Sequence, residues 1–421
     1  MKTMSKRSKI EAIIGFALIA LVLVLGFAGA FSGTVFVKCL IGLGFGYTLT
    51  RGDFGFAGLS NRACRTGSTK LIRSLMIMFV VSAMIVGAFI VGGSNPSLWV
   101  NPISWGLLFG GVLFGIGMAF SSCCATGVLQ DVPLGFSRAL ITLLFFGVGV
   151  FLGFPLMSSG FVRNSIFTSG GAYNGVWMVD WFSANGTNMA VGVVGALLVT
   201  ILLAALVGTL AKWYEKKVAK NFPTPEIKAV EEVEPTIWNK FFVKKWSMTQ
   251  TAITIAVLFG MLYAVTNTGW GASTVYGNWF GTILHRWFGV SLDSLANFTG
   301  WTIEKATSSF NTSLFKSAGY MQNIGIIVGA FVGLLLSGKF TTAFKAGLKI
   351  KPLEIALFVA GGLLLGFGTR LSLGCNVGAL YTPIANFSLA GWLYFFFLFA
   401  GGYIGNMIRK AFYKKVDCPK N

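Results

Sequence analysis

Charged side chains are scarce in this sequence. Only 11% of its 421 residues are Asp, Glu, Lys or Arg, whereas 55% are hydrophobic and the mean hydropathy is +0.74. This composition excludes an ordinary soluble protein. Apolar runs such as 12–30 and 189–211 have the roughly 20 residues that a helix needs to cross a bilayer. The sequence therefore predicts an all-α polytopic membrane protein.

Residues that bind metals or form disulfides are also few. Histidine occurs once, at position 285, and the six cysteines show none of the paired spacings of a metal site. Most of the cysteines lie in or beside apolar runs, which does not fit the disulfide framework of a secreted protein. No cofactor motif is present. We therefore expect no metal, no cofactor and no enzymatic activity.

Acidic residues are outnumbered, because 33 Lys and Arg face 13 Asp and Glu, a net charge of +20. These charges lie in short loops between apolar runs, which is typical of cytoplasmic loops and does not indicate nucleic-acid binding. With ten crossings, most of the basic residues fall on one side of the membrane together with both termini, so both termini are expected in the cytoplasm. The predicted spans are 10–30, 34–50, 75–93, 103–122, 139–158, 190–211, 248–266, 320–338, 353–374 and 388–408.

The first nine residues are basic and precede an apolar run, as in a signal peptide. The run is longer than a signal sequence needs and has no clear cleavage site, so we expect a retained first helix. The chain then divides into an N-terminal helix, a first repeat with its following helix, a polar linker, a helix with an outer segment, and a second repeat with a basic tail. These units cover 1–33, 34–211, 212–247, 248–319 and 320–421.

The outer segment, 267–319, contains Trp270, Trp279, Trp287 and Trp301. Tryptophan is enriched where a protein meets the membrane–water interface. We therefore expect amphipathic pieces of this segment to lie at the interface.

A segment with two glycines and a cysteine occurs twice, at 115–127 and 366–378. In each copy a Gly-x-Gly pair is followed by a cysteine and, three residues later, by another glycine. One constant offset relates Gly115 to Gly366, Gly117 to Gly368, Cys124 to Cys375, Gly127 to Gly378, Phe136 to Phe387 and Ser137 to Ser388. This agreement indicates an internal duplication.

The two copies are predicted to run in opposite directions through the membrane. The first contains an extra helix, 75–93, before its cysteine helix, and the second does not. One helix fewer reverses the direction of everything that follows it. We therefore expect two inverted pseudo-repeats, whose broken helices meet near the centre of the bilayer and form a substrate site.

The cysteine segments are natural places for a break in a membrane helix. Cys-Ala-Thr-Gly at 124–127 and Cys-Asn-Val-Gly at 375–378 are each followed closely by a proline, and irregular backbone at this depth must line a cavity or be buried in protein. A helix that restarts there presents free N–H groups to an anion. A thiol is soft and polarizable, which suits sulfur or selenium better than a hydrated hard ion.

Candidate site residues are therefore Cys124, Cys375, Gly127 and Gly378. Buried cysteines often only pack, but two at equivalent positions of a duplication favour function over packing. Cys123 stands where the second copy has Gly374, so it is either an accessory thiol or filler.

Arginines form a second group of candidates. Arg51 follows the second predicted span, and Arg62 and Arg65 come soon after it, where they either attract an anion or set the topology of the chain. Arg370 lies inside the ninth span, where an arginine is costly and usually functional. An interhelical salt bridge is the alternative for Arg370, with Asp53 as a conceivable partner.

Three motifs resemble the YeeE/YedE family of membrane proteins, which is implicated in uptake of thiosulfate and, in one branch, in selenium-related metabolism. They are Gly42-x-Gly44-x-Gly46 leading to Arg51-Gly-Asp-Phe54, then 114–127, then 366–375. The motifs occur in family order, and the resemblance covers about 34–408.

The resemblance implies a constriction lined by cysteines, through which thiosulfate passes by thiol–sulfur hydrogen bonds without covalent chemistry. Cys124 and Cys375 match two of the family's cysteines. The third position falls at Gly55, which has no thiol, so either Cys64 or Cys123 compensates or the substrate is a different sulfur species. The family also implies a soluble sulfur-carrier protein on the cytoplasmic side, with the loops 51–74 and 212–247 as candidate docking surfaces.

These observations predict inward transport of a small sulfur-containing anion across the bacterial cytoplasmic membrane. Two alternatives remain open. The protein is a membrane thiol oxidoreductase that uses Cys123 and Cys124, or it transports an unrelated solute and its cysteines only pack. The expected partners are the anion, the lipid bilayer and a sulfur-carrier protein.

Overall fold

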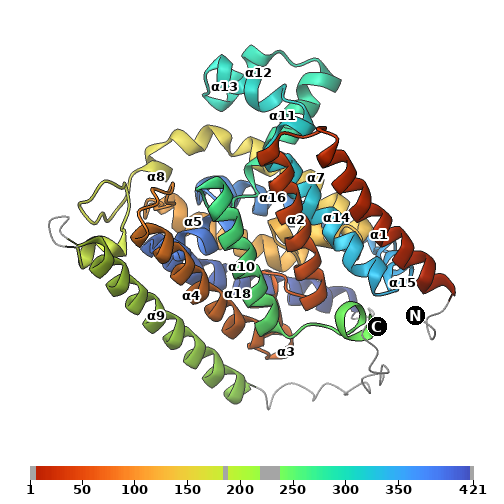
Figure 1. Cartoon of the computed structure of the whole chain (residues 1–421), viewed down its shortest axis with the longest axis horizontal. Coiled ribbons are helices and arrows are strands. Elements are labelled where there is room, and N and C mark those ends of the chain that lie inside the picture. The colour runs from red at the N-terminus through yellow and green to blue at the C-terminus, as the bar shows by residue number, and fades with distance from the viewer. Residues whose placement is uncertain (1–5, 184–187, 219–237, 418–421) are drawn as a thin grey trace.

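The computed structural model describes residues 6–183, 188–218 and 238–417 (Figure 1). This part of the chain is helical and contains no β-strand, which confirms the all-α prediction. The ten long helices are α1 (Lys6–Phe27), α2 (Gly33–Gly52), α4 (Lys70–Val91), α5 (Trp105–Ser121), α7 (Phe136–Leu152), α9 (Met189–Val218), α10 (Met248–Thr266), α14 (Ala318–Leu336), α16 (Pro352–Leu371) and α18 (Leu389–Asp417).

Shorter helices join the long ones. The α-helical ones are α3 (Gly58–Thr66), α6 (Ala125–Asp131), α8 (Gly160–Arg163), α11 (Thr274–Phe288), α12 (Leu292–Thr299), α13 (Ile303–Phe310), α15 (Phe340–Gly347) and α17 (Thr382–Ala385). The 3₁₀ turns are η1 (Phe154–Ser158), η2 (Met178–Trp181) and η6 (Leu314–Lys316), and the π-helical turns are η5 (Asn239–Val243) and η7 (Asn376–Tyr381).

Each predicted span corresponds to one long helix. In the described part of the chain, nine spans are long and apolar enough to cross a membrane, and α7 is apolar but shorter at 17 residues. Several boundaries differ from the prediction. Helices α9 and α18 run on to Val218 and Asp417, past the predicted ends at 211 and 408. Helix α4 begins at Lys70, because its first turn is tied to α9 by an ion pair between Arg73 and Glu215 at 2.7 Å. Helix α7 ends at Leu152, where Gly153 and Pro155 lead into a 3₁₀ turn.

Helices α5 and α16 pack closely through glycines. A Cβ on Gly110 would lie 2.8 Å from the carbonyl oxygen of Gly368, and a Cβ on Gly117 would lie 2.9 Å from that of Gly361. As the residue number rises along α5 it falls along α16, so the two helices are antiparallel. Gly361 and Gly368 are also the repeat equivalents of Gly110 and Gly117, so the contact maps onto itself, as in a two-fold interface.

The internal repeat also relates the helices that pack beside α5 and α16. Gly115 of α5 lies against the backbone of α18 at Leu398, and its equivalent, Gly366 of α16, lies against the backbone of α7 at Phe146. Small residues allow helices to approach each other closely in membranes. The glycines of the duplicated segments thus bring both cysteine helices into the centre of the bundle, while α1 and α9 lie at its edges (Figure 1).

The outer segment forms α11, α12 and α13, which gather at one end of the bundle (Figure 1). Trp287 is 81% exposed, as expected of an interfacial anchor. Trp270 is an exception to the prediction. It is completely buried and stacks on Phe45 of α2 with ring centroids 3.9 Å apart, so it belongs to the core.

Replacing a central glycine is expected to destabilise the bundle. The change Gly117→Val should cost about 1–3 kcal/mol of unfolding free energy, the usual penalty of overpacking, because the new side chain meets the backbone of α16. The matched control is Gly208→Val in α9, where an added Cβ has no atom within 4 Å. Thermal unfolding of the purified variants in detergent measures both, and equal melting temperatures would contradict the packing described.

Candidate functional site

Both cysteine helices break at equivalent residues. Helix α5 ends at Ser121 and α16 ends at Leu371, and the backbone then turns through a left-handed residue, Ser122 at φ 60° or Leu373 at φ 56°. Side chains disfavour this conformation, so it persists only where the surrounding packing enforces it. The predicted breaks are therefore confirmed in both copies of the repeat.

A serine hydroxyl stabilises each break from inside. Ser121 Oγ donates to the carbonyl oxygen of Gly117 at 2.8 Å and lies 3.1 Å from that of Cys123. At the equivalent position Ser372 Oγ donates to Gly368 at 2.7 Å and lies 2.9 Å from the carbonyl oxygen of Gly374. These serines were not among the predicted site residues, although the repeat offset relates them and could have identified them.

A new helical turn starts at the cysteine of each copy. Cys124 has extended φ and ψ angles of −117° and −177° and caps α6, where its thiol accepts a hydrogen bond from the Gly127 N–H at 3.3 Å. Cys375, at −90° and −169°, precedes η7 in the same way. The carbonyl of each cysteine accepts from the N–H four residues later, Val128 or Ala379. Both thiols are buried.

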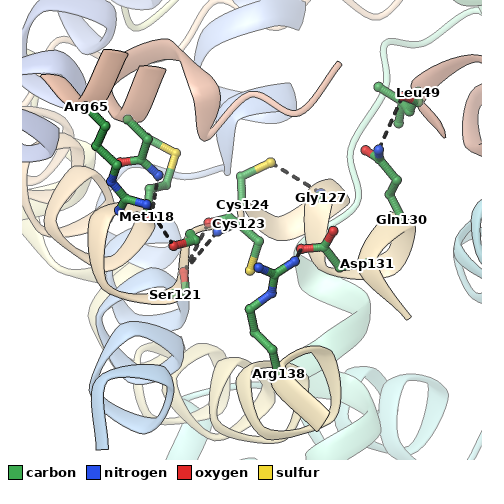
Figure 2. A network of polar contacts seen from close by, with 12 residues as sticks. Leu49, Arg65, Met118, Ser121, Cys123, Cys124, Gly127, Gln130, Asp131 and Arg138 are labelled. Carbon is green, nitrogen blue, oxygen red and sulfur yellow. Dashed lines mark hydrogen bonds and ion pairs between the residues drawn. The ribbon is translucent and has the colours of Figure 1, made fainter. Parts of the chain in front are cut away.

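A cavity of about 220 Å³ lies on the Cys124 side of this centre. Five of the candidate residues, Cys123, Cys124, Gly127, Arg62 and Arg65, line it together. The full lining is Asp53, Gly55, Ala57, Gly58, Asn61, Arg62, Arg65, Ser122, Cys123, Cys124, Gly127, Gln130, Asp131 and Arg138. We call this space the Cys124 cavity. Figure 2 shows that the Cys124 thiol points to Gly127 and the Cys123 thiol points to Arg138.

The charges in the Cys124 cavity are mostly paired. Arg138 binds Asp131 at 2.7 Å, and Arg62 binds Asp53 at 3.3 Å. Arg65 differs, because it forms no ion pair with any described carboxylate and instead donates to neutral groups. The cavity therefore offers guanidinium groups and thiols together in one partly buried place.

Two predicted residues lie away from this cavity. Arg51 is buried and donates to the carbonyl oxygens of Val243 and Lys244, so it anchors the turn η5 to the end of α2. Arg51 does not line the Cys124 cavity, and its place on the substrate path stays a prediction. Cys64 is half-buried on α3, where burial raises the pKa of its thiol, and it does not line the Cys124 cavity. Of the two cysteines suggested to compensate for the missing thiol at Gly55, only Cys123 lines the cavity, and the compensation itself stays a prediction.

Arg370 is almost completely buried near Cys375. Its guanidinium donates to Ser273 Oγ at 2.8 Å and to Thr274 Oγ1 at 3.1 Å. The suggested partner Asp53 is wrong, because Asp53 pairs with Arg62 and Lys245 on the Cys124 side. Arg370 therefore joins α16 to the start of α11 through neutral hydroxyl groups.

Gly378 and Cys375 belong to the same side as Arg370. The carbonyl oxygen of Gly378 accepts from Asn101 Nδ2 at 3.4 Å, and an added Cβ there would lie 3.1 Å from the ring of Trp99. Neither Gly378 nor Cys375 lines the Cys124 cavity. The two cysteines thus face different surroundings.

Two buried tyrosines lie close to the Cys124 break and to α5. Tyr276 of α11 is fully buried and donates to the carbonyl oxygen of Ala125, the residue after Cys124, at 2.5 Å. Tyr394 of α18 is equally buried, and its ring lies 3.4 Å from the position of an added Cβ on Gly111 of α5. No sequence signal pointed to Tyr276, because the outer segment gave no indication that it reaches Cys124.

The sequence of this chain is similar to those of several known proteins. A family model described as sulphur transport matches residues 51–404. The thiosulfate transporter TsuA of Spirochaeta thermophila is 23% identical over 383 residues, covering 88% of this chain and 97% of that protein. TsuA of Escherichia coli is 23% identical over 85% of this chain and 89% of its own length.

A shorter similarity links the chain to the probable transporter YedE of Salmonella typhimurium, at 28% identity over 172 residues. It covers 40% of each protein, so the chain matches less than half the length of that relative. The family match contains both helix breaks and the residues of the Cys124 cavity. The resemblance predicted from the motifs is therefore confirmed, and the chain belongs to the sulphur transport family of membrane proteins.

Proposed function

We propose that this protein transports a small sulfur-containing anion, thiosulfate or a related sulfur or selenium species, inward across the bacterial cytoplasmic membrane. It is then a transporter with no catalytic step of its own. The observation that carries the proposal is the position of Cys124, whose thiol lines a cavity shared with Arg62, Arg65 and Arg138. Guanidinium groups attract the anion, and the thiol contacts its sulfur atom.

The surroundings of Cys124 leave its S–H group able to donate. A sulfur lone pair accepts from the Gly127 N–H, and the Thr126 hydroxyl lies 3.5 Å from the sulfur. A thiol is a weak donor and a weak acceptor. A passing anion can therefore replace Thr126 as the partner of the S–H group, and no covalent bond has to form or break.

The paired contacts of the two repeats support an inverted arrangement. Helices α5 and α16 are antiparallel, and each cysteine follows the C-terminal end of its own helix. Cys124 and Cys375 therefore lie toward opposite ends of this helix pair. Arg62, Arg65, Arg138 and Lys245 gather around Cys124, and cytoplasmic sides of membrane proteins are rich in such residues. The Cys124 cavity then opens to the cytoplasm, Cys375 faces outward, and the constriction lies between them at Tyr276 and Tyr394.

A cytoplasmic sulfur-carrier protein is part of this proposal. Its docking surface would be the loops at 51–74 and 212–247. Arg62 and Arg65 of the first loop line the Cys124 cavity, and Lys245 of the second pairs with Asp53, which also lines it. Residues 219–237 of the second loop lie outside the described residues.

The oxidoreductase alternative finds less support in the geometry. Cys123 and Cys124 are adjacent, yet their thiols point in different directions, one to Arg138 and one to Gly127 (Figure 2). A disulfide requires the two Cβ atoms to face each other. We therefore assign Cys123 to the cavity wall.

Removing either central thiol should lower uptake. A hydrogen bond to a charged group contributes about 1.5–3 kcal/mol, so Cys124→Ala and Cys375→Ala should each reduce thiosulfate uptake by about tenfold or more. The control is Cys39→Ala, since Cys39 is buried among Phe31, Val35 and Met321 away from both breaks. Uptake of radiolabelled thiosulfate by whole cells measures the effect, and full uptake in both central variants would refute the thiol contact.

A thiol at Gly55 should be accommodated in the cavity. Gly55 lines the Cys124 cavity, and an added Cβ there has no atom within 4 Å. We expect Gly55→Cys to fold normally, to react with a small thiol reagent from the cytoplasmic side, and to lower the KM for thiosulfate. Gly58→Cys is the matched control, because it lines the same cavity but its Cβ would lie 2.7 Å from Leu71. An unreactive thiol at position 55 would show that the cavity does not reach the cytoplasm.

A further inference from the structure

Two arginines meet at the helix break just before the adjacent cysteines. Arg65 of α3 donates from Nη1 to Ser122 Oγ at 3.4 Å, and Arg409 of α18 donates from Nη1 to the same oxygen at 2.6 Å. Both also donate to the carbonyl oxygen of Ala119, at 3.1 and 2.9 Å. Ser122 is followed directly by Cys123 and Cys124. Two positive charges are therefore held beside the Cys124 cavity by one hydroxyl and the end of α5.

These two charges are not neutralised. Within the described ranges, neither Arg65 nor Arg409 forms an ion pair, whereas Arg62 and Arg138 both do. Arg409 is linked to Glu354 only through Tyr413, whose hydroxyl accepts from Arg409 Nη2 and donates to Glu354 Oε1. Burial and repulsion from Arg409 lower the pKa of Arg65 to about 10. Arg65 is exposed and Arg409 is half-buried, so both guanidinium groups are accessible to an anion that enters from solvent.

A single cation would be enough to stabilise the end of α5. The helix dipole attracts one positive group at its C-terminus, and the effect is modest and confined to the last turn. A second guanidinium at the same carbonyl oxygen adds repulsion. Capping therefore needs only one of the two arginines. Arg65 also donates from Nε to Asn406 Oδ1 at 2.9 Å, which joins α3 to α18 and leaves its Nη groups for Ser122 and Ala119.

The arginines also stand where two cavities meet. Arg65 lines the Cys124 cavity, and Arg409 lines a neighbouring cavity of about 280 Å³ with Lys349 and Glu354. Ser122 and Arg138 line both. At about 30 Å³ of liquid volume for each water molecule, each cavity has room for a small anion and part of its hydration shell.

We propose that Arg65, Arg409 and Ser122 form a second anion-binding position, which takes a small divalent oxyanion or thioanion from Cys124 and passes it to the outer cavity at Lys349. This inference rests on the transport function proposed above. The anion supplies the negative charge that the two guanidinium groups lack. A divalent anion interacts with both groups at once, so this position favours it over a monovalent one.

The direct test is anion binding to the purified, detergent-solubilised protein. Titration calorimetry with thiosulfate and, separately, with monovalent thiocyanate should show tighter binding of thiosulfate to the unmodified protein. Arg65→Gln and Arg409→Gln should each weaken thiosulfate binding by about tenfold, the loss expected for one charged hydrogen bond. The control is Arg73→Gln, because Arg73 is already neutralised by Glu215 at 2.7 Å.

The double variant Arg65→Gln/Arg409→Gln tests whether the two arginines act on one anion. Residues that share a binding partner show non-additive effects, so the double variant should bind less than a hundredfold more weakly than the unmodified protein. Arg65→Lys and Arg409→Lys keep the charge and serve if a Gln variant fails to fold. They should bind thiosulfate more weakly than arginine does, because lysine lacks the planar fork, yet more tightly than glutamine. Unchanged thiosulfate affinity in every arginine variant would overturn the proposal.

Failure of this inference and failure of the transport proposal are distinguishable. If the cysteine variants lose uptake while the arginine variants bind and transport normally, the second position does not exist and transport stands. If the unmodified protein moves no sulfur anion but its thiosulfate binding depends on Arg65 and Arg409, the position exists and the transport proposal is wrong.

Discussion

The broken backbone inside a bundle of membrane helices is the constraint on which the rest of the structure depends. Every freed N–H and C=O group at such a depth needs a partner within the protein. Ser121 and Ser372 bond to carbonyl oxygens on both sides of their breaks, and the glycine contacts between α5 and α16 seal the space around them. Without these devices the cysteines could not stand at the start of new helical turns with buried thiols.

Around that fixed centre the structure separates neutral from charged chemistry. The thiols and the two tyrosines are uncharged groups, which are cheap to bury in a membrane protein. On the Cys124 side, guanidinium groups line the cavity, and Arg409 and Lys349 line the neighbouring one; on the Cys375 side, Arg370 is buried among neutral hydroxyl groups. An anion that leaves the centre therefore moves from weak, soft contacts toward charge–charge attraction. In the transport that we propose, this order would let a doubly charged species pass the neutral constriction without being trapped in it.

The sequence predicted the helices and the two breaks, because apolar run length and the Gly–Cys pattern act locally. It was less informative wherever a role depends on a distant partner. Arg51 looked like part of an anion path but anchors residues 243 and 244, and Asp53 pairs with Arg62 instead of Arg370. Tyr276 reaches the Cys124 break from an outer helix far along the chain, and Arg409 seemed only a charge in a basic tail. Only the folded arrangement brings these residues together.

The central claim is that an anion passes between the two buried cysteines, in contact with both thiols. A crystal structure of the protein soaked with selenosulfate tests it most directly, because the anomalous scattering of selenium locates the anion without ambiguity. We predict selenium peaks beside the sulfur of Cys124 and beside that of Cys375, along one path past Tyr276 and Tyr394. Peaks confined to other surfaces, with both thiols still enclosed by packed side chains, would contradict the account.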